Sequence, residues 1–252
     1  MRLLLYSAGS PAQDLALEEA IQTTVEEGLS TNTWRLWQAA VPCVVLGTGL
    51  EAAREAALDA ARAEGLPVLR RHSGGGAVVI GPGVLNYSAF YQLKDLPGSE
   101  TIRGAMSASL KPVLALLAAW GLPACEMGLS DLAVARADGL LRKIAGNAQA
   151  RKRHSVLVHG SLLADPDLER IARVLRFPSA APEYRAGRSH SAFLTSLREQ
   201  GAPYDLGSFV AALARALEHP ASPEEAPSAE EQRRAAKLLA EKYGTAEWNF
   251  RR

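Results

Sequence analysis

The sequence has little of what marks several specialised classes of protein. Its two cysteines, Cys43 and Cys125, are too few for a disulfide framework or a cysteine zinc site. Its 28 basic and 27 acidic side chains nearly cancel, which excludes a charge-rich disordered chain and leaves no basic field for nucleic acid. The longest apolar run, 112–120, is about half a membrane span, and the N-terminal run is too short for a signal sequence. We therefore expect a cytoplasmic protein without a membrane or nucleic-acid partner.

What the sequence does have is a hydrophobic fraction of 48%, enough for a full core at this length. The first helix is the clearest element. Ser10 is its expected N-cap, Pro11 suits the first helical position and Gln13 completes a capping-box pattern. Apolar residues then recur on one face until Gly28, which is expected to end the helix.

Strands and isolated helices follow one another without the regular repeat of a doubly wound sheet. The segments 77–80 and 86–92 are expected to pair as a hairpin around the Gly81-Pro82-Gly83 turn. Besides the first helix, the expected elements are strands at 34–37, 43–46, 67–70, 77–80, 86–92, 130–135, 141–150 and 155–163, and helices at 51–64 and 101–120. This order predicts an α+β fold with mixed, largely antiparallel sheets and flanking helices.

The strongest local signal is a glycine-rich run that follows two arginines, Arg70-Arg71-His72-Ser73-Gly74-Gly75-Gly76-Ala77-Val78. Successive glycines lose much backbone entropy on folding. They are tolerated where a ligand lies against bare backbone whose N–H groups hold phosphate oxygens. The arginines would add charge-assisted hydrogen bonds to the same anion. The alternative is a flexible turn beside ordinary surface arginines.

A second signal is a lysine in a strand of small residues, Arg142-Lys143-Ile144-Ala145-Gly146-Asn147-Ala148-Gln149. Little side-chain bulk surrounds Lys143, so a ligand has room there and the ammonium can neutralise a carboxylate or phosphate. The alternative is an exposed strand lysine, which is the usual fate of this residue.

The remaining motifs are less specific. The His159-Gly160-Ser161 step can place a donor at the edge of a site, although a turn histidine bonded to backbone carbonyls is commoner. The histidines have no metal-ligand spacing and no serine lies in a G-x-S-x-G elbow, so neither a metal site nor a Ser-His-Asp triad is predicted. The run 47–52 fits a loose dinucleotide fingerprint, with Arg70 placed for an NADP phosphate. No second βαβ half follows, which disfavours that alternative.

Taken in order, these motifs resemble the lipoate–protein ligase A and octanoyltransferase family, which is related to biotin–protein ligases. The family patterns that occur here are D-x-A-L at 14–17, R-R-x-[ST]-G-G-G-A-V at 70–78, G-x-x-N-x-S at 83–88, [GR]-K-[IV]-x-G-[SN]-A at 142–148, H-G-[ST]-L-L at 159–163 and E-W-N-F at 247–250. The resemblance covers nearly the whole chain and implies the α+β catalytic domain of biotin/lipoate protein ligases.

The resemblance also sets expectations for domain organisation. It implies a single catalytic domain over 1–252, with 220–252 as a linker and C-terminal helical tail. Ligases of the family continue into a small accessory domain, and the sequence shows none after Phe250, so a separate small subunit is one expected partner. The family's His-Asp pair is replaced by Ile80-Gly81, which leaves the role of that pair open.

By resemblance, the protein is an ATP-dependent ligase that forms an acyl adenylate and transfers a lipoyl or octanoyl group to a lysine of a carrier. The implied carriers are lipoyl domains of 2-oxoacid dehydrogenases or an H-like protein of glycine cleavage. Lys143 is the implied catalytic residue, bridging the acyl carbonyl and the α-phosphate. The implied nucleotide- and acyl-binding residues are Arg70, Arg71, Ser73, Gly74, Gly75, Gly76, Ala77, Val78, Val79, Asn86, Gly146, Ala148, His159 and Gly160. Magnesium is expected with the ATP phosphates, although no acidic cage is evident.

A transferase of the same family is the alternative. It would take octanoate from an acyl carrier protein, or a lipoyl group by amidotransfer, and needs neither ATP nor another cofactor. One branch uses a nucleophilic cysteine in an Ala-Cys segment, and Ala124-Cys125 lies 18 residues before Lys143. The segment 128–132 is closer to the ligase pattern, and a buried inert thiol is the commoner state of cysteine. A non-catalytic acyl-binding relative is the third alternative.

Overall fold

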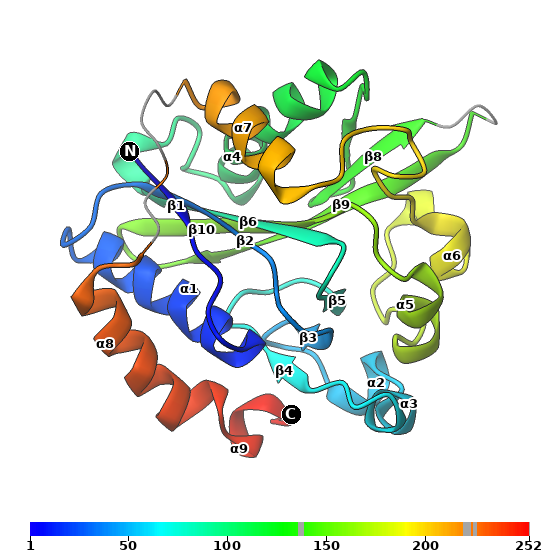
Figure 1. Ribbon diagram of the computed structural model, residues 1–252, viewed down its shortest axis with the longest axis horizontal. Helices are drawn as coiled ribbons and strands as arrows, with labels where there is room; N and C mark the ends of the chain where they lie inside the picture. The colour runs from blue at the N-terminus through cyan, green and yellow to red at the C-terminus, as the bar shows by residue number, and fades with distance from the viewer. Residues whose placement is uncertain (136–138, 219–222, 224–225, 252) are drawn as a thin grey trace.

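Two β-sheets organise the computed structural model, which describes residues 1–135, 139–218, 223 and 226–251 (Figure 1). The large sheet contains, in spatial order, β1 (Arg2–Leu5), β2 (Thr33–Trp37), β6 (Val84–Gln92), β10 (Ser155–Leu163), β9 (Leu141–Arg151), β8 (Asp131–Ala135) and β7 (Cys125–Met127). The small sheet contains β4 (Val68–Arg70), β3 (Cys43–Leu46) and β5 (Val78–Ile80). The pairs β1–β2 and β3–β4 are parallel and the other pairs are antiparallel. The predicted α+β class is confirmed.

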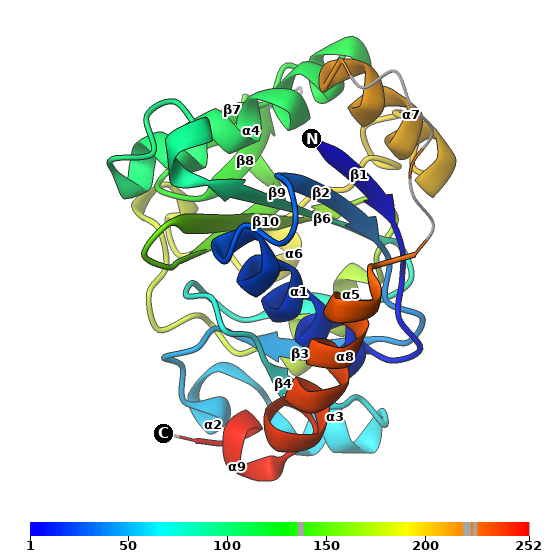
Figure 2. The same cartoon turned by 90° about the vertical axis from the view of Figure 1, so that its left-hand side faces the viewer.

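Helices cover both faces of the large sheet (Figures 1 and 2). They are α1 (Pro11–Glu26), α2 (Ala52–Glu55), α3 (Leu58–Ala63), α4 (Ile102–Ala119), α5 (Leu168–Val174), α6 (His190–Phe193), α7 (Leu206–Ala216), α8 (Ala229–Leu238) and α9 (Ala246–Asn249), with short turns η1 (Leu93–Asp95), η2 (Glu183–Arg185) and η3 (Leu239–Tyr243). One face packs against α4 and α7, and the other faces α1 and the small sheet. The space between the two sheets is where the candidate site lies.

The first helix forms as its sequence predicts. The Ser10 hydroxyl accepts from the Gln13 N–H, Pro11 begins α1, and Gly28 follows the helix with a φ of 73°. Leu17 and Ile21 pack against the sheet and are almost fully buried. This packing, rather than intrinsic propensity, fixes α1 on the sheet.

Helix α4 is apolar and, at 18 residues, long enough to cross a membrane on length and composition alone. Its side chains Leu110, Val113 and Leu117 are instead buried in the largest hydrophobic cluster, between α7 and the sheet. A core helix passes the same test, so the composition of α4 is weak support for a membrane span.

The predicted hairpin of 77–80 with 86–92 is wrong. β5 pairs with β3 in the small sheet, whereas β6 pairs with β2 and β10 in the large sheet. The Gly81-Pro82-Gly83 turn therefore carries the chain from one sheet to the other. Gly83 has a φ of 81°, and a Cβ there would lie 2.1 Å from the Asp165 carbonyl oxygen, so this crossing requires glycine.

The single helix expected over 51–64 is also wrong, because α2 and α3 are separate. The Ala57 N–H donates to the Val174 carbonyl oxygen, and Ala56 forms a β-bridge with Leu175. Contact with the end of α5 overrides the helical propensity of this alanine-rich stretch.

The C-terminal elements α8 and η3 run back along α1, and α9 follows them beside β4 (Figure 2). Ser228 and Glu231 form a capping box at the start of α8, and Glu231 makes a 2.6 Å ion pair with Arg2. Residues 220–222 and 224–225 of the expected linker and tail lie outside the described part of the chain.

Candidate active site

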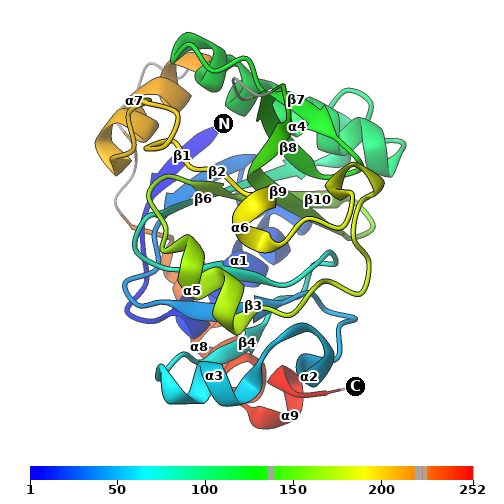
Figure 3. The same cartoon turned by 90° about the vertical axis from the view of Figure 1, so that its right-hand side faces the viewer.

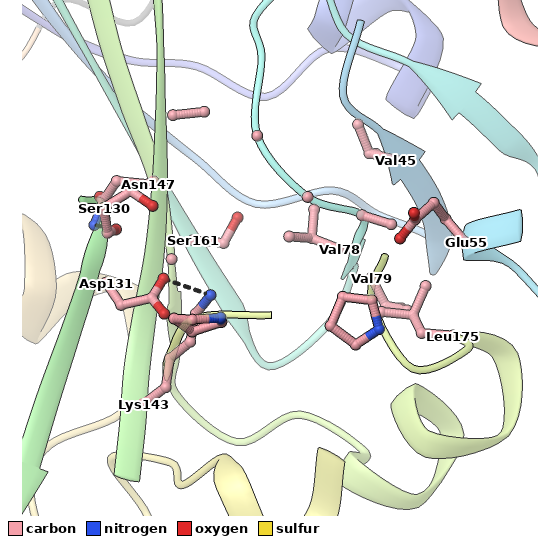
Figure 4. A pocket seen from close by; sticks show the side chains of 18 of the residues that line it. Val45, Glu55, Val78, Val79, Ser130, Asp131, Lys143, Asn147, Ser161 and Leu175 are labelled. Atoms are coloured by element: carbon pink, nitrogen blue, oxygen red, sulfur yellow. Dashed lines mark hydrogen bonds and ion pairs between the residues drawn. The ribbon is translucent and has the colours of Figure 1, made fainter. Parts of the chain in front are cut away.

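A cavity of about 670 Å³ lies between the large and the small sheet (Figure 4). Side chains of β9 and β10 form the floor, and Val78 and Val79 of β5 form the opposite wall. The segment 175–185, which follows α5, contributes a third side (Figure 3). This volume is within the range of small-molecule sites in proteins.

A single row of residues crosses the floor of the cavity on five neighbouring strands. The register places Trp37 opposite Asn86, Asn86 opposite Ser161, Ser161 opposite Gly146, and Gly146 opposite Asp131. Cross-strand partners point to the same face of a sheet. All five residues line the cavity, so the pairing of the strands positions this floor.

Lys143 reaches over this floor from β9. Its Nζ lies 2.7 Å from Oδ1 of Asp131, and its side chain is 23% exposed. A Cβ at Gly146 would lie 2.6 Å from that Nζ, so glycine makes room for the lysine itself. Gly146 was expected to leave space for a ligand. The structure shows that it leaves space for the Lys143 ammonium, which lies across the sheet.

Asp131 connects Lys143 to the third wall. Tyr184 donates a 2.9 Å hydrogen bond to Oδ2 of Asp131. Burial and the negative charge of Asp131 both raise the pKa of Tyr184 well above its usual range. The tyrosine therefore remains a neutral donor and holds the carboxylate that faces Lys143.

The arginine–glycine loop, residues 70–76, approaches the cavity between the two sheets. The Arg71 guanidinium lies inside the curve of the loop, where it donates to the Ser73 hydroxyl (2.9 Å) and to the carbonyl oxygen of Gly76 (2.9 Å). Burial lowers the pKa of Arg71 to about 10, which still leaves it charged at pH 7. Gly75 adopts a φ of 85°, a conformation that glycine permits.

A buried chain of hydrogen bonds ties this loop to α1. Because arginine donates only, the Ser73 hydroxyl that accepts from Arg71 is free to donate to Nε2 of His159, 2.6 Å away. His159 Nδ1 lies 2.9 Å from Glu18 Oε2. Burial alone raises the pKa of Glu18, but His159 and Arg35 outweigh burial and bring it to about 2. Glu18 is therefore an ionised partner that orients the histidine.

Most residues predicted for the site line the cavity. They are Arg71, Gly75, Gly76, Ala77, Val78, Val79, Asn86, Lys143, Gly146, Ala148, His159 and Gly160. Ser73 and Gly74 are not among the described lining residues, and Ser73 instead contacts His159. A Cβ at Gly160 would lie 2.1 Å from Oδ1 of Asn147, so this glycine is also required by packing.

The contacts of Arg70 differ from those expected of a ligand-binding residue. Its side chain is fully buried and donates to backbone carbonyl oxygens, including those of Gly47 and Asn249, and Arg70 is not among the described lining residues. The same geometry removes the basis for an NADP phosphate at Arg70. A Cβ at Gly47 would lie 2.0 Å from the Gly75 carbonyl oxygen, so close packing explains the glycine of the supposed fingerprint.

Cys125 is exposed on the edge strand β7 and is a free thiol, contrary to the buried alternative. It is not among the described residues that line the cavity, whereas Met127 is. Residues two apart on a strand share a face, so Cys125 and Met127 lie on the same side of β7.

Several lining residues were not predicted. Trp37 and Asp131 belong to the floor, and Glu18 lines the cavity from α1. Arg185 also lines the cavity; it is nearly buried, 3% exposed, with its guanidinium over the Phe177 ring. Asp131 directly follows the 128–130 turn and begins a strand, which was a usable signal. Glu18 lies on the buried side of an amphipathic helix, where a charged residue needs a partner.

The cavity does not form a metal site of its own. The part of the chain that the structure describes contains no cluster of three metal-ligating side chains. Asp131 is paired with Lys143 and Glu18 with His159. A magnesium ion would have to arrive with the phosphates of a nucleotide.

The fold and the site define a class of protein: an α+β domain with a charged lysine over a sheet floor, facing a glycine-rich loop across a ligand-sized cavity. Residues 10–218 match the model of the lipoyl protein ligase A/B catalytic domain, and the chain belongs to that family.

Similar proteins agree with this assignment over the whole chain. Octanoyltransferase LipM of Kyrpidia tusciae is 32% identical over 275 aligned positions that cover 100% of this chain and 98% of the relative. The bi-partite lipoate protein ligase of Thermoplasma acidophilum, studied with its E2 lipoyl domain, superposes with a TM-score of 0.82 at 25% identity, covering 99% and 95%. A lipoate-protein ligase A bound with ATP gives 0.79 at 26% identity, covering 99% and 98%.

Proposed function

We propose that this enzyme transfers a lipoyl or octanoyl group from an activated donor to a lysine of a lipoyl carrier domain. The observation that carries the proposal is the position of Lys143, whose ammonium lies over Gly146 and against Asp131 in a cavity large enough for an acyl chain and its activating group. The relatives named above supply the identity of the acyl group and of the carrier.

The favoured donor is an acyl adenylate made from ATP. The carrier amine attacks the acyl carbonyl carbon, the C–N bond forms, and the C–O bond to phosphate breaks. AMP leaves with the electron pair, and the amine proton passes to solvent. Lys143 is the proposed source of the positive charge that stabilises the negative charge developing on the carbonyl oxygen. Arg71 and the backbone of 75–79, which form part of the cavity lining, are the proposed contacts of the nucleotide.

The apolar part of the cavity is the proposed acyl site. Trp37 and Ala148 line it from the large sheet, and Val45 and Ile80 line it from the small sheet. Each methylene buried there contributes about 0.8 kcal/mol to binding. Ile80 stands where the family has histidine, so this wall is more apolar here than the family pattern implies.

The proposed acceptor is a separate lipoyl carrier domain in the cytoplasm, because the solved Thermoplasma ligase was studied with such a domain. Both cysteines are free thiols, which fits a reducing compartment. The accessory small subunit expected from the ligase resemblance is the proposed partner for the activation step.

A second candidate is a thioester-dependent octanoyltransferase. Two observations favour it: similarity to LipM extends over the whole chain, and Cys125 is an exposed thiol on the same face of β7 as the cavity-lining Met127. In this case the Cys125 thiolate attacks the octanoyl thioester, and the thiol of the acyl carrier protein leaves. The lysine amine of the lipoyl carrier domain then attacks the acyl-Cys125 thioester, takes the acyl group and regenerates the Cys125 thiol. The absence of Cys125 from the described lining makes the adenylate route our first choice.

A three-donor assay distinguishes these routes. Purified protein is given a lipoyl carrier domain and one of three donors: lipoate with ATP and magnesium, synthetic octanoyl adenylate, or octanoyl acyl carrier protein. Modification of the carrier lysine is measured by mass spectrometry. We expect rapid transfer from octanoyl adenylate, and Cys125→Ser should leave that rate unchanged.

Lys143→Ala is the test of the shared chemistry. Removing one preorganised charge at a developing oxyanion should lower the transfer rate by about 10²-fold or more. Full activity of a folded Lys143→Ala variant with every donor would contradict the proposal. Transfer from octanoyl acyl carrier protein alone, lost in Cys125→Ser, would establish the second candidate instead.

A further inference from the structure

The E-W-N-F segment near the C-terminus takes no part in the cavity, yet it contacts the arginine–glycine loop closely. We call residues 243–251 the C-terminal segment. Figure 2 shows α9 of this segment beside β4, which leads into the loop. Buried polar contacts between segments so far apart in sequence need a structural or functional reason.

Arg70 is the centre of these contacts. Its guanidinium donates to carbonyl oxygens of two chain segments that are about 200 residues apart in sequence. The acceptors in the first segment are Gly47 (3.0 Å), Thr48 (3.3 Å) and Leu50 (2.6 Å), and those in the second are Trp248 (3.1 Å), Asn249 (3.1 Å) and Arg251 (2.9 Å). Only a planar guanidinium offers enough fixed donors to bridge both segments.

Asn249 completes the connection from the other side. Its Oδ1 accepts from the Arg70 backbone N–H at 2.9 Å, and its Nδ2 donates to the carbonyl oxygens of Tyr243 (3.0 Å) and Thr245 (2.9 Å). The indole of Trp248 donates to the Arg70 carbonyl oxygen at 2.8 Å. The backbone and the side chain of Arg70 are therefore both bonded to the C-terminal segment.

The 47–50 segment, which is bonded to Arg70, also contacts the part of the loop that lines the cavity. The Thr48 N–H donates to the Ser73 carbonyl oxygen at 2.8 Å, and Gly47 packs so closely on Gly75 that a Cβ would lie 2.0 Å from its oxygen. Gly75 lines the cavity. Any shift of the 47–50 turn must therefore move the loop that faces the ligand.

A second contact ties the middle of the loop to the same segment. His72 lies with Nδ1 3.2 Å from the Tyr243 hydroxyl and Nε2 2.8 Å from the Gln22 side-chain oxygen. The Tyr243 hydroxyl donates to Glu19 of α1 at 2.5 Å. The loop is thus bonded to the C-terminal segment at both Arg70 and His72, and His72 also links it to α1.

We propose that the C-terminal segment positions the donor-binding loop, with Arg70 and Asn249 as a clasp that sets the conformation of residues 71–76. Arg70 and Asn249 are positioning residues: they act on the ligand through Arg71 and Gly75 and do not touch it. The nature of the ligand rests on the proposed function, but the positioning of the loop does not.

The test uses the full-length chain with Asn249→Ala, which removes one acceptor and two donors while leaving Arg70 in place. Loss of a buried hydrogen-bond partner corresponds to about a tenfold change in an equilibrium. We expect amide hydrogen exchange in 71–76 to accelerate about tenfold and the KM for octanoyl adenylate to rise by a similar factor, with kcat changed less than about threefold. Arg70→Lys should act in the same direction.

Arg234→Ala is the matched control, because Arg234 also ties the C-terminal helices to α1, through Glu27, but lies outside the clasp. It should leave exchange in 71–76 and the KM unchanged. Exchange in β10 serves as the internal measure of global unfolding. Unchanged exchange in 71–76 in Asn249→Ala, or acceleration equal to that in β10, would overturn the proposal. If the wild type transfers no acyl group, the proposed function fails while the exchange result still decides the clasp.

Discussion

At the scale of single residues, the position of Lys143 depends on a neighbour that has no side chain. In Gly146→Ala, the new Cβ would lie 2.6 Å from Nζ and 2.7 Å from Cε of Lys143. We expect the flexible lysine to move while the fold is kept, because the obstructed atoms are the far end of a long side chain. A displacement of about 1 Å in a catalytic group can lower the rate about 10²-fold.

The measurement for Gly146→Ala is kcat for acyl transfer, with the melting temperature as the control for folding. The activity of Lys143→Ala gives the baseline that remains without the ammonium. An unchanged kcat in Gly146→Ala would show that the ammonium need not lie across the sheet.

The sequence singled out candidate site residues that belong to a local motif. Lys143 and the glycines of the loop stood out because small residues or successive glycines next to a charge are unusual, and Lys143, Gly75 and Gly76 line the cavity. The contacts that Arg70 makes were not predicted, because its acceptors are backbone carbonyl oxygens from distant segments, which leave no mark on the sequence near it. Glu18 was missed because its partner, His159, comes from a strand 141 residues away.

At the scale of elements, Gly76 provides a sharper test of the arginine–glycine loop than Gly75, the central glycine of its run. Gly75→Val combines a branched side chain with a φ of 85°, so lost binding there could reflect strain. At Gly76 a Cβ meets nothing within 4 Å, and the residue lines the cavity. Gly76→Val should keep the stability of the protein and weaken donor binding by at least about tenfold through steric exclusion.

Calorimetry with octanoate and with AMP measures this change in binding. Ala118→Val is the control, because Ala118 is an exposed residue of α4 and is not among the described lining residues. Unchanged affinity for both ligands in Gly76→Val would exclude the loop from the binding site.

Elements with a strong local pattern were predicted well, and those set by tertiary contacts were not. The capped helix α1 and the long strands β9 and β10 follow from caps, alternation and turn residues. β5 and β6 looked like a hairpin because a glycine-proline turn joins them, but the better partners of each strand lie in different sheets. The short strand β1 was not predicted, because its parallel pairing with β2 has no local signature.

At the scale of the whole molecule, His72 links α1, the loop and the C-terminal segment, and it makes stability depend on pH. Burial lowers the pKa of His72 from 6.5 to about 4, and the attraction of Glu19 and Glu18 does not compensate. A depressed pKa means that the unfolded chain takes up the proton first. The resulting stability is complete above pH 6.5 and is lost as the pH falls towards 4.

Urea unfolding at several pH values checks this dependence. We expect the free energy of unfolding to fall by up to about 1.4 kcal/mol per pH unit below pH 6.5 from this group. In His72→Gln, which does not titrate, that part of the slope should disappear. An identical slope in the variant would assign the acid sensitivity to other groups, such as the Glu19 carboxyl in the same cluster.

The floor of the cavity has a consequence for how the protein acquires activity. Its five residues come from five strands, so the site exists only when four strand registers are correct at once. A slip of β10 by one residue would turn Ser161 away and present Leu162, now in the core on the α4 side, to the ligand. A misregistered chain can therefore keep its sheet content and still be inert. During refolding, catalytic activity should appear later than the circular dichroism signal of the sheet. The activity then measures how many chains have the correct strand register, whereas the circular dichroism measures only how much sheet has formed.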